Sequence, residues 1–103
     1  RSCVDGLIAL IELDGADLGT DRAVGLPSKT FSIADGIEAL NRISAARGIE
    51  LGPISDRPDS EVEAIVATWP TRTESGRASA LGVPGDNSLD SIIEEYVEDY
   101  VAV

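Results

Sequence analysis

The 103-residue sequence contains no histidine and only one cysteine, Cys3. Histidine is the usual general base near neutral pH, and histidine and cysteine are the main protein ligands of zinc and other transition metals. A single cysteine also excludes a disulfide bond within the chain. We therefore expect no catalytic residues and no metal-binding residues in this chain.

Aromatic and basic residues are scarce too. Aromatic residues make up 4% of the chain, and 8 Lys and Arg residues stand against 19 Asp and Glu residues, which gives a formal net charge of -11. Nucleic acids and anionic membranes bind basic surfaces, so this charge argues against both as partners. Solubility explains the acidity, and an acidic docking face is the alternative.

Long apolar runs are missing as well. No apolar stretch approaches the ~20 residues that span a bilayer, and the N-terminal residues lack the basic and apolar regions of a signal peptide. These features predict a cytoplasmic protein. A chain of 103 residues supports one domain, which would expose about 5,500 Å² if it were compact around a modest aliphatic core.

Apolar residues recur at helical spacing through much of the chain. Val4, Leu7, Ile8 and Ile11, for example, occupy positions i, i+3, i+4 and i+7 of one helix face. The expected fold class is α/β and rich in helices, with about five helices and two short strands. The predicted helices cover residues 3–13, 33–47, 61–69, 74–81 and 88–101, and the predicted strands cover residues 22–26 and 49–54. Because two strands alone are not stable, we expect them to lie under the helices or, preferably, to extend a sheet from another part of the protein.

Capping patterns predict where three of these helices begin. A side chain that accepts from the helix N-terminus, with a polar residue three positions later, satisfies backbone N–H groups that the helix leaves unpaired. The patterns are Ser32 with Asp35, Ser60 with Glu63, and Ser91 with Glu94. The last helix is expected to start at Asn87 or Ser88.

Trp69 and Arg72 are candidate ligand contacts. Trp69 ends an apolar helical stripe, which favours a core position, and a wall for a small polar ligand is the alternative. Arg72 follows the helix stop at Pro70, on a loop where a side chain can reach a cleft. Its guanidinium group matches both oxygens of a carboxylate. Arg77 is expected to pair with Glu74 or with a helix terminus.

Several tracts carry a family resemblance. Trp69-Pro70, Arg72, Arg77-Ala78 and Leu81-Gly82, within residues 61–99, resemble the C-terminal part of extended short-chain dehydrogenases/reductases of the NAD-dependent epimerase/dehydratase family, in particular its sugar-acid dehydrogenases. Thr73 stands where an aromatic residue is usual in that family. Upstream, residues 22–27 and 32–40 are similar to the family, and Arg1-Ser2 matches the segment that opens its substrate region.

The resemblance implies that residues 1–103 form a single substrate-binding C-terminal domain of a larger enzyme. An N-terminal Rossmann domain of that enzyme would bind NAD or NADP and carry a tyrosine followed four residues later by lysine. In this chain the only lysine is Lys29, and Tyr96 is followed at that spacing by Tyr100. We therefore expect no cofactor-binding residues here and no activity of the chain alone.

The implied substrate is a sugar acid or a nucleotide sugar, in which the intact enzyme oxidises or epimerises a hydroxyl-bearing carbon. Arg1, Ser2, Trp69 and Arg72 are the expected substrate-binding residues. The alternative is a small, acidic, stand-alone interaction domain that lacks catalytic activity, as a monomer or a dimer. A large exposed apolar surface favours the enzyme part, whereas a polar monomer favours the alternative. Homo-oligomerisation of the enzyme is left open.

Overall fold

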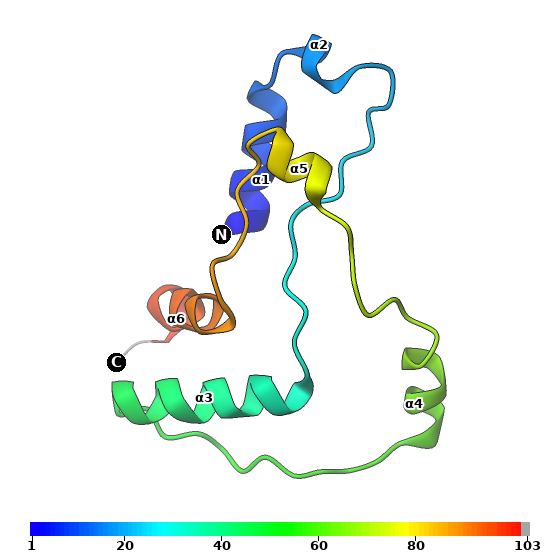
Figure 1. Ribbon diagram of the computed structural model, residues 1–103. Helices are drawn as coiled ribbons and strands as arrows, with labels where there is room; N and C mark the ends of the chain where they lie inside the picture. Colours follow the sequence, from blue (N-terminus) through cyan, green and yellow to red (C-terminus); the bar gives the residue numbers. More distant parts are fainter. Residues whose placement is uncertain (102–103) are drawn as a thin grey trace.

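The computed structural model describes residues 1–101, which form six α-helices joined by extended segments (Figure 1). The helices are α1 (Ser2–Glu12), α2 (Gly15–Leu18), α3 (Ile33–Arg47), α4 (Ser60–Val66), α5 (Gly76–Ala80) and α6 (Leu89–Tyr100). No residue in this described range belongs to a β-strand. The protein is therefore helical, and the predicted α/β class with two short strands is wrong.

The two segments predicted as strands are irregular and pair with no other described segment. Residues 22–26 pack against α1 instead, where Leu26 lies so close to Gly6 that a Cβ atom on this glycine would be 2.9 Å from Leu26 Cδ2. Residues 49–54 contain Pro53, which has no N–H group to donate to a ladder. The apolar side chains in these segments reflect packing against helices rather than sheet formation.

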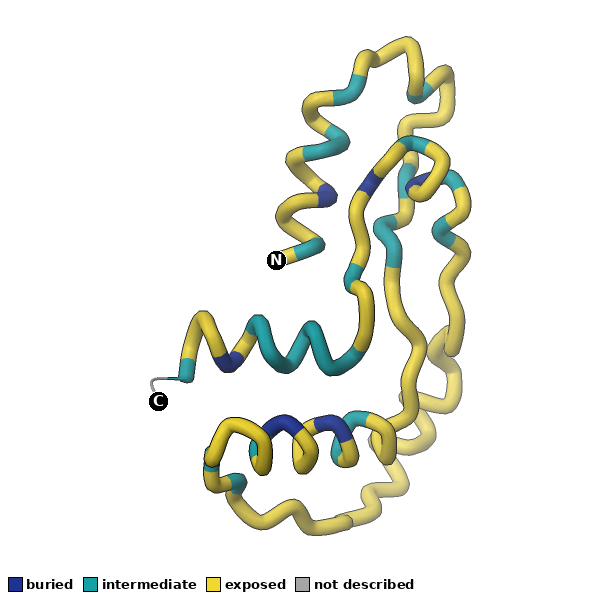
Figure 2. The backbone as a smooth tube through the Cα atoms, turned by 60° about the vertical axis from the view of Figure 1, so that its left-hand side comes forward, coloured by how far each residue is buried: buried dark blue, intermediate teal, exposed yellow. Residues whose placement is uncertain are grey.

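Helices α3 and α6 pack against each other more closely than any other pair of described helices (Figure 1). Ala39 and Ile43 of α3 are 0% and 3% exposed, and Val97 of α6 is 7% exposed. The buried part of α3 faces α6 in Figure 2. This contact is one of two small apolar clusters in the structure.

Ion pairs flank the contact between α3 and α6. Arg42 donates to both carboxylate oxygens of Asp90 at 3.1 and 2.5 Å, and Arg47 pairs with Glu94. The hydrogen bond from Arg42 lowers the pKa of Asp90 below its usual value. Exposed ion pairs stabilise proteins little. The free energy that holds α3 against α6 therefore comes mainly from the buried apolar contact.

The second cluster joins α1 to α5 and its flanking segments. Gly6 of α1, Ala78 of α5 and Val83 are buried. A Cβ atom on Gly6 would lie 3.3 Å from Val83 Cγ1 as well as against Leu26. The absence of a side chain at Gly6 therefore lets these apolar groups approach the α1 backbone.

Arg77 ties this cluster to the loop after α2. Its guanidinium donates to the carbonyl oxygens of Ala23 at 2.8 Å and Leu18 at 2.6 Å, and to that of Asp21. It also pairs with the Asp21 carboxylate at 3.2 Å. Glu74, one of the two expected partners, is not among these contacts. Leu18 is the last residue of α2, so the alternative expectation, that Arg77 pairs with a helix terminus, is confirmed.

Replacing Arg77 with alanine should release the loop of residues 18–23. Charged hydrogen bonds contribute about 1.5–3 kcal/mol each where they replace water, and we expect a local loss of about 2 kcal/mol. Hydrogen exchange of the loop amides measures this loss. The matched control is Arg22→Ala, because Arg22 makes one contact, to the Gly15 carbonyl at 3.2 Å. Equal effects of the two substitutions would contradict the assigned role of Arg77.

The described chain is open rather than compact. Its radius of gyration is 17.4 Å, against about 13 Å for a compact domain of this length. It exposes 7979 Å², well above the roughly 5,500 Å² expected of a compact chain. Its smallest extent is 17 Å, against 51 and 37 Å in the other two directions. The expected single core is therefore replaced by two small clusters.

Several apolar helix faces consequently lie in solvent (Figure 2). The residues of the α1 stripe are between 48% exposed, at Ile8, and 83% exposed, at Ile11. In and after α4, Ile65 is 59% exposed and Trp69 is 62% exposed. The apolar periodicity of the sequence predicts these helix faces, but predicts them as parts of a buried core. None of the described helices combines the length and the apolar character that a membrane crossing requires.

Candidate functional site

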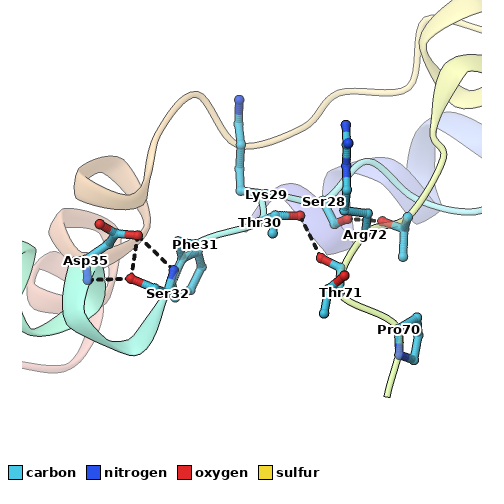
Figure 3. A pocket seen from close by; sticks show the side chains of 10 residues that line it. Ser28, Lys29, Thr30, Phe31, Ser32, Asp35, Pro70, Thr71 and Arg72 are labelled. Atoms are coloured by element: carbon cyan, nitrogen blue, oxygen red, sulfur yellow. Dashed lines mark hydrogen bonds between the residues drawn. The ribbon is translucent and has the colours of Figure 1, made fainter. Parts of the chain in front are cut away.

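A groove of about 730 Å³ lies where the segment before α3 passes the segment after α4 (Figure 3). Its walls come from two stretches of chain, residues 28–35 and 70–73. The lining residues are Ser28, Lys29, Thr30, Phe31, Ser32, Asp35, Pro70, Thr71, Arg72 and Thr73. The volume falls within the range of about 300–1,000 Å³ typical of small-molecule sites.

Side-chain hydroxyl groups join the two stretches. Thr30 Oγ1 donates to the carbonyl oxygen of Thr71 at 3.3 Å, and the hydroxyl groups of Ser28 and Thr73 hydrogen-bond to each other. Both stretches lack regular secondary structure, so these contacts are what hold one beside the other. The groove is thus built on long-range contacts between loops.

The N-terminus of α3 forms one end of the groove. Ser32 accepts from the Asp35 backbone N–H at 3.1 Å, and Asp35 accepts from the Ser32 N–H at 2.8 Å and from its hydroxyl at 2.7 Å. The hydrogen bond from the Ser32 side chain, followed by that from its backbone, lowers the pKa of Asp35. The predicted capping box is confirmed, and the one carboxylate that lines the groove is already engaged in it.

Two cations project from the groove walls. Lys29 and Arg72 extend in a similar direction from the two neighbouring stretches in Figure 3. Among the described residues, neither forms an ion pair, whereas four arginines do: Arg1, Arg42, Arg47 and Arg77. The groove therefore carries two unpaired positive charges in a chain of net charge -11.

Arg72, one of the four expected substrate-binding residues, lines this groove. Trp69 lies just outside the described lining, after α4, with its backbone N–H donating to the Val66 carbonyl at 2.9 Å. The core position favoured for Trp69 is wrong, because its side chain is 62% exposed.

Arg1 and Ser2 lie elsewhere, in a cavity of about 300 Å³ between the start of α1 and α6. Arg1 donates to Asp99 at 3.1 and 2.5 Å and to Glu98 at 3.1 Å, and Ser2 donates to the Asp86 carboxylate. The structure therefore does not bring these two residues together with Arg72.

The electrostatics of the second cavity disfavour an anion. The hydrogen bonds that Arg1 donates to Asp99 and then to Glu98 raise the pKa of Arg1, and the same hydrogen bond from Arg1 lowers the pKa of Asp99. Asp86 and Glu95 add two more acidic groups to the lining. For Arg1 to bind a negatively charged substrate, it would have to exchange these carboxylates for that of the ligand. Its assignment as a substrate contact stays a prediction.

The described residues contain no group of three or more His, Cys, Asp and Glu side chains that could hold a metal ion. The groove residues that sequence reasoning missed are Lys29 and its hydroxyl-bearing neighbours, which lie outside every predicted helix and strand. The run Ser28-Lys29-Thr30 directly after Pro27 combines a cation with hydroxyl groups, and this combination could have identified them as candidate ligand contacts.

The chain is similar to two enzymes named D-erythronate dehydrogenase. It is 39% identical to the one from Cupriavidus necator over 103 residues, which covers 96% of this chain and 30% of that protein. It is 24% identical to the one from Haemophilus influenzae over 98 residues, which covers 95% of this chain and 30% of that protein. The predicted resemblance to sugar-acid dehydrogenases, and to D-erythronate dehydrogenases in particular, is confirmed.

The chain thus spans about 30% of the length of the curated relatives it matches. No model of a known protein family matches the sequence. No solved structure matches it significantly.

Proposed function

We propose that this chain is the substrate-binding, C-terminal part of a D-erythronate dehydrogenase-like enzyme, which oxidises a sugar acid with NAD or NADP. The observation that carries this proposal is the similarity to two D-erythronate dehydrogenases over 95–96% of the chain. The remaining length of such an enzyme would supply the cofactor-binding Rossmann domain and the catalytic tyrosine and lysine. Residues 1–103 would form a single domain that has no catalytic activity by itself.

The open shape supports this role. Large apolar side chains along one face of α1 and in α4 are 47% or more exposed, and each exposed apolar face costs free energy in proportion to its area. A second domain packed on these faces would remove that cost. The rival hypothesis, a stand-alone acidic interaction domain, predicts a polar surface instead. A nucleotide-sugar epimerase is the second candidate within the same family, and it differs in substrate rather than in architecture.

The proposed contribution of this part to catalysis is orientation. Holding the reacting carbon against the cofactor converts an encounter between free molecules into a reaction within one complex, which removes an entropic part of the barrier. The cofactor supplies the hydride chemistry when it is bound. The residues of this chain would bind the substrate through Arg72 and, on the family resemblance, through Arg1, Ser2 and Trp69.

Substituting Arg72 with alanine in the full-length enzyme should raise the KM for D-erythronate about tenfold or more. Loss of a charged hydrogen bond has this size, and an equal loss in ground and transition states leaves kcat nearly unchanged. Arg1→Ala should also raise KM if Arg1 contacts substrate. Steady-state kinetics measures both, with Arg57→Ala as the control, since Arg57 is exposed and outside the groove.

Because Arg1 is tied to Asp99 and Glu98, its substitution also loosens α1 from α6. Melting temperatures of the variants separate this structural effect from loss of a substrate contact. Kinetics unchanged in both arginine variants would remove both residues from the site.

A further inference from the structure

The groove between residues 28–35 and 70–73 gathers the scarce positive charge of the chain. Lys29 is the only lysine in the sequence, and it lines the same groove as Arg72. The two stretches are joined by the hydrogen bond from Thr30 to Thr71, residues 41 positions apart in sequence. The fold, rather than local sequence, therefore brings these cations into one groove.

Two cations that line one groove without acidic partners attract an anion to that groove, because opposite charges attract. The groove's own carboxylate, Asp35, does not serve as this anion, because it accepts hydrogen bonds from the Ser32 N–H and hydroxyl groups. Figure 3 also places Asp35 at the α3 end, at the opposite end of the view from Arg72. The groove is therefore suited to a negatively charged ligand.

The neutral lining of the groove is rich in hydroxyl groups. Ser28, Thr30, Thr71 and Thr73 all belong to it. A hydroxyl group both donates and accepts hydrogen bonds, so a cluster of them matches the hydroxyl groups of a sugar chain. Together with the two cations, this lining fits a small molecule that carries one carboxylate and several hydroxyl groups.

We infer that Lys29 and Arg72, one from each of the two stretches that line this groove, bind the carboxylate of the sugar acid, an assignment that rests on the proposed function. Arg72 offers two parallel N–H donors to the carboxylate, and Lys29 offers a point charge. The hydroxyl-bearing side chains contact the carbon chain of the ligand. Lys29 is thus a second specificity-determining residue, which selects the acid over the neutral polyol.

The test compares Lys29→Gln, Arg72→Gln and the control Arg57→Gln in the full-length protein. Each removes one positive charge, and all three side chains are exposed, so folding should be preserved. Calorimetry measures the binding of D-erythronate and of erythritol, its neutral counterpart. We expect each groove variant to weaken D-erythronate binding about tenfold, with erythritol binding and the control unchanged. Lys29→Arg should retain most of the affinity.

Wild-type affinity for D-erythronate in Lys29→Gln would overturn the assignment of Lys29. Inorganic phosphate that competes with D-erythronate in the wild type and binds more tightly would also overturn it, in favour of a phosphate-bearing ligand. Turnover is recorded separately. If neither groove variant changes the NAD- or NADP-dependent oxidation of D-erythronate, the proposed function would be retained, but the groove would be refuted as the substrate-binding site. Wild-type binding without any oxidation would instead count against the proposed function.

Discussion

Purified alone, a polypeptide of residues 1–103 is expected to oxidise no D-erythronate with either NAD or NADP. The chain lacks a glycine-rich dinucleotide loop and the Tyr and Lys at the required spacing, so the loss should be complete rather than partial. A coupled absorbance assay for reduced nicotinamide measures it. The full-length enzyme, assayed at the same molar concentration, is the positive control.

The same polypeptide should self-associate and bind a hydrophobic dye. Its exposed apolar faces include α1, where Val4 is 58% exposed and Ile11 is 83% exposed, and such faces promote association. Light scattering and dye fluorescence measure both properties. Substituting Ile11 with glutamate should reduce both, because it places a charge on the most exposed part of the stripe. Turnover by the isolated polypeptide would contradict the proposed division of labour, and a dye-free monomer would favour the stand-alone interaction domain.

Substitution of Ile43 by alanine should destabilise the contact between α3 and α6 by about 2–4 kcal/mol. Ile43 is 3% exposed, and removing buried methyl groups costs both their transfer free energy and the cavity they leave. Hydrogen exchange of the α3 and α6 amides in the full-length protein measures this local stability, and it should quicken by about two orders of magnitude.

Ile33→Ala is the matched control for Ile43→Ala. It makes the same chemical change in the same helix, at a position that is 79% exposed. Surface substitutions of this kind usually change stability by less than about 0.5 kcal/mol. If the two substitutions acted equally on exchange, the buried contact through Ile43 would not be what holds α3 against α6.

Helix starts and stops were the most predictable part of the fold, although neighbouring residues compete for them. Ser32 caps α3 as expected, and Gly48 ends it with φ of 66°, a left-handed conformation that glycine adopts without strain. Asp59 rather than Ser60 caps α4. At the last helix, Ser88 forms a capping box with Ser91 in place of the expected pair, Ser91 with Glu94. Local rules fixed the ends of α1, α3 and α6 to within a residue, but α4 ends at Val66, three residues before its predicted end, and α5 begins at Gly76, two residues after its predicted start. They also do not choose between adjacent polar side chains.

Apolar periodicity shows which face of a helix is apolar, but it does not say what covers that face. The stripes of α3 and α6 meet, and Ile43 and Val97 are buried there. The stripe of α1 has the same spacing, yet Ile8 and Ile11 are exposed. The strand assignments failed for a related reason, because strand formation requires a neighbouring chain segment that local sequence does not specify.

Only one residue of the candidate site, Arg72, could be predicted from its local sequence. Arg72 was identified from its position after a helix stop and from the geometry of its side chain. Lys29 was missed because its significance depends on the crossing of two stretches held together by the contact between Thr30 and Thr71. Arg1 was named from family resemblance alone, and its ion pairs with α6 follow from the packing of the chain ends, which no local pattern encodes.

The thinnest dimension of the described chain is 17 Å, less than twice the roughly 10–12 Å diameter of one helix with its side chains. So thin a layer of helices has two outer faces and little interior. Denaturing it on its own would therefore uncover less area than denaturing a compact domain of the same length, so its heat-capacity increment and denaturant sensitivity should both be smaller. Sharp, cooperative melting of the full-length protein would then come from the domain that we propose to pack on this thin layer.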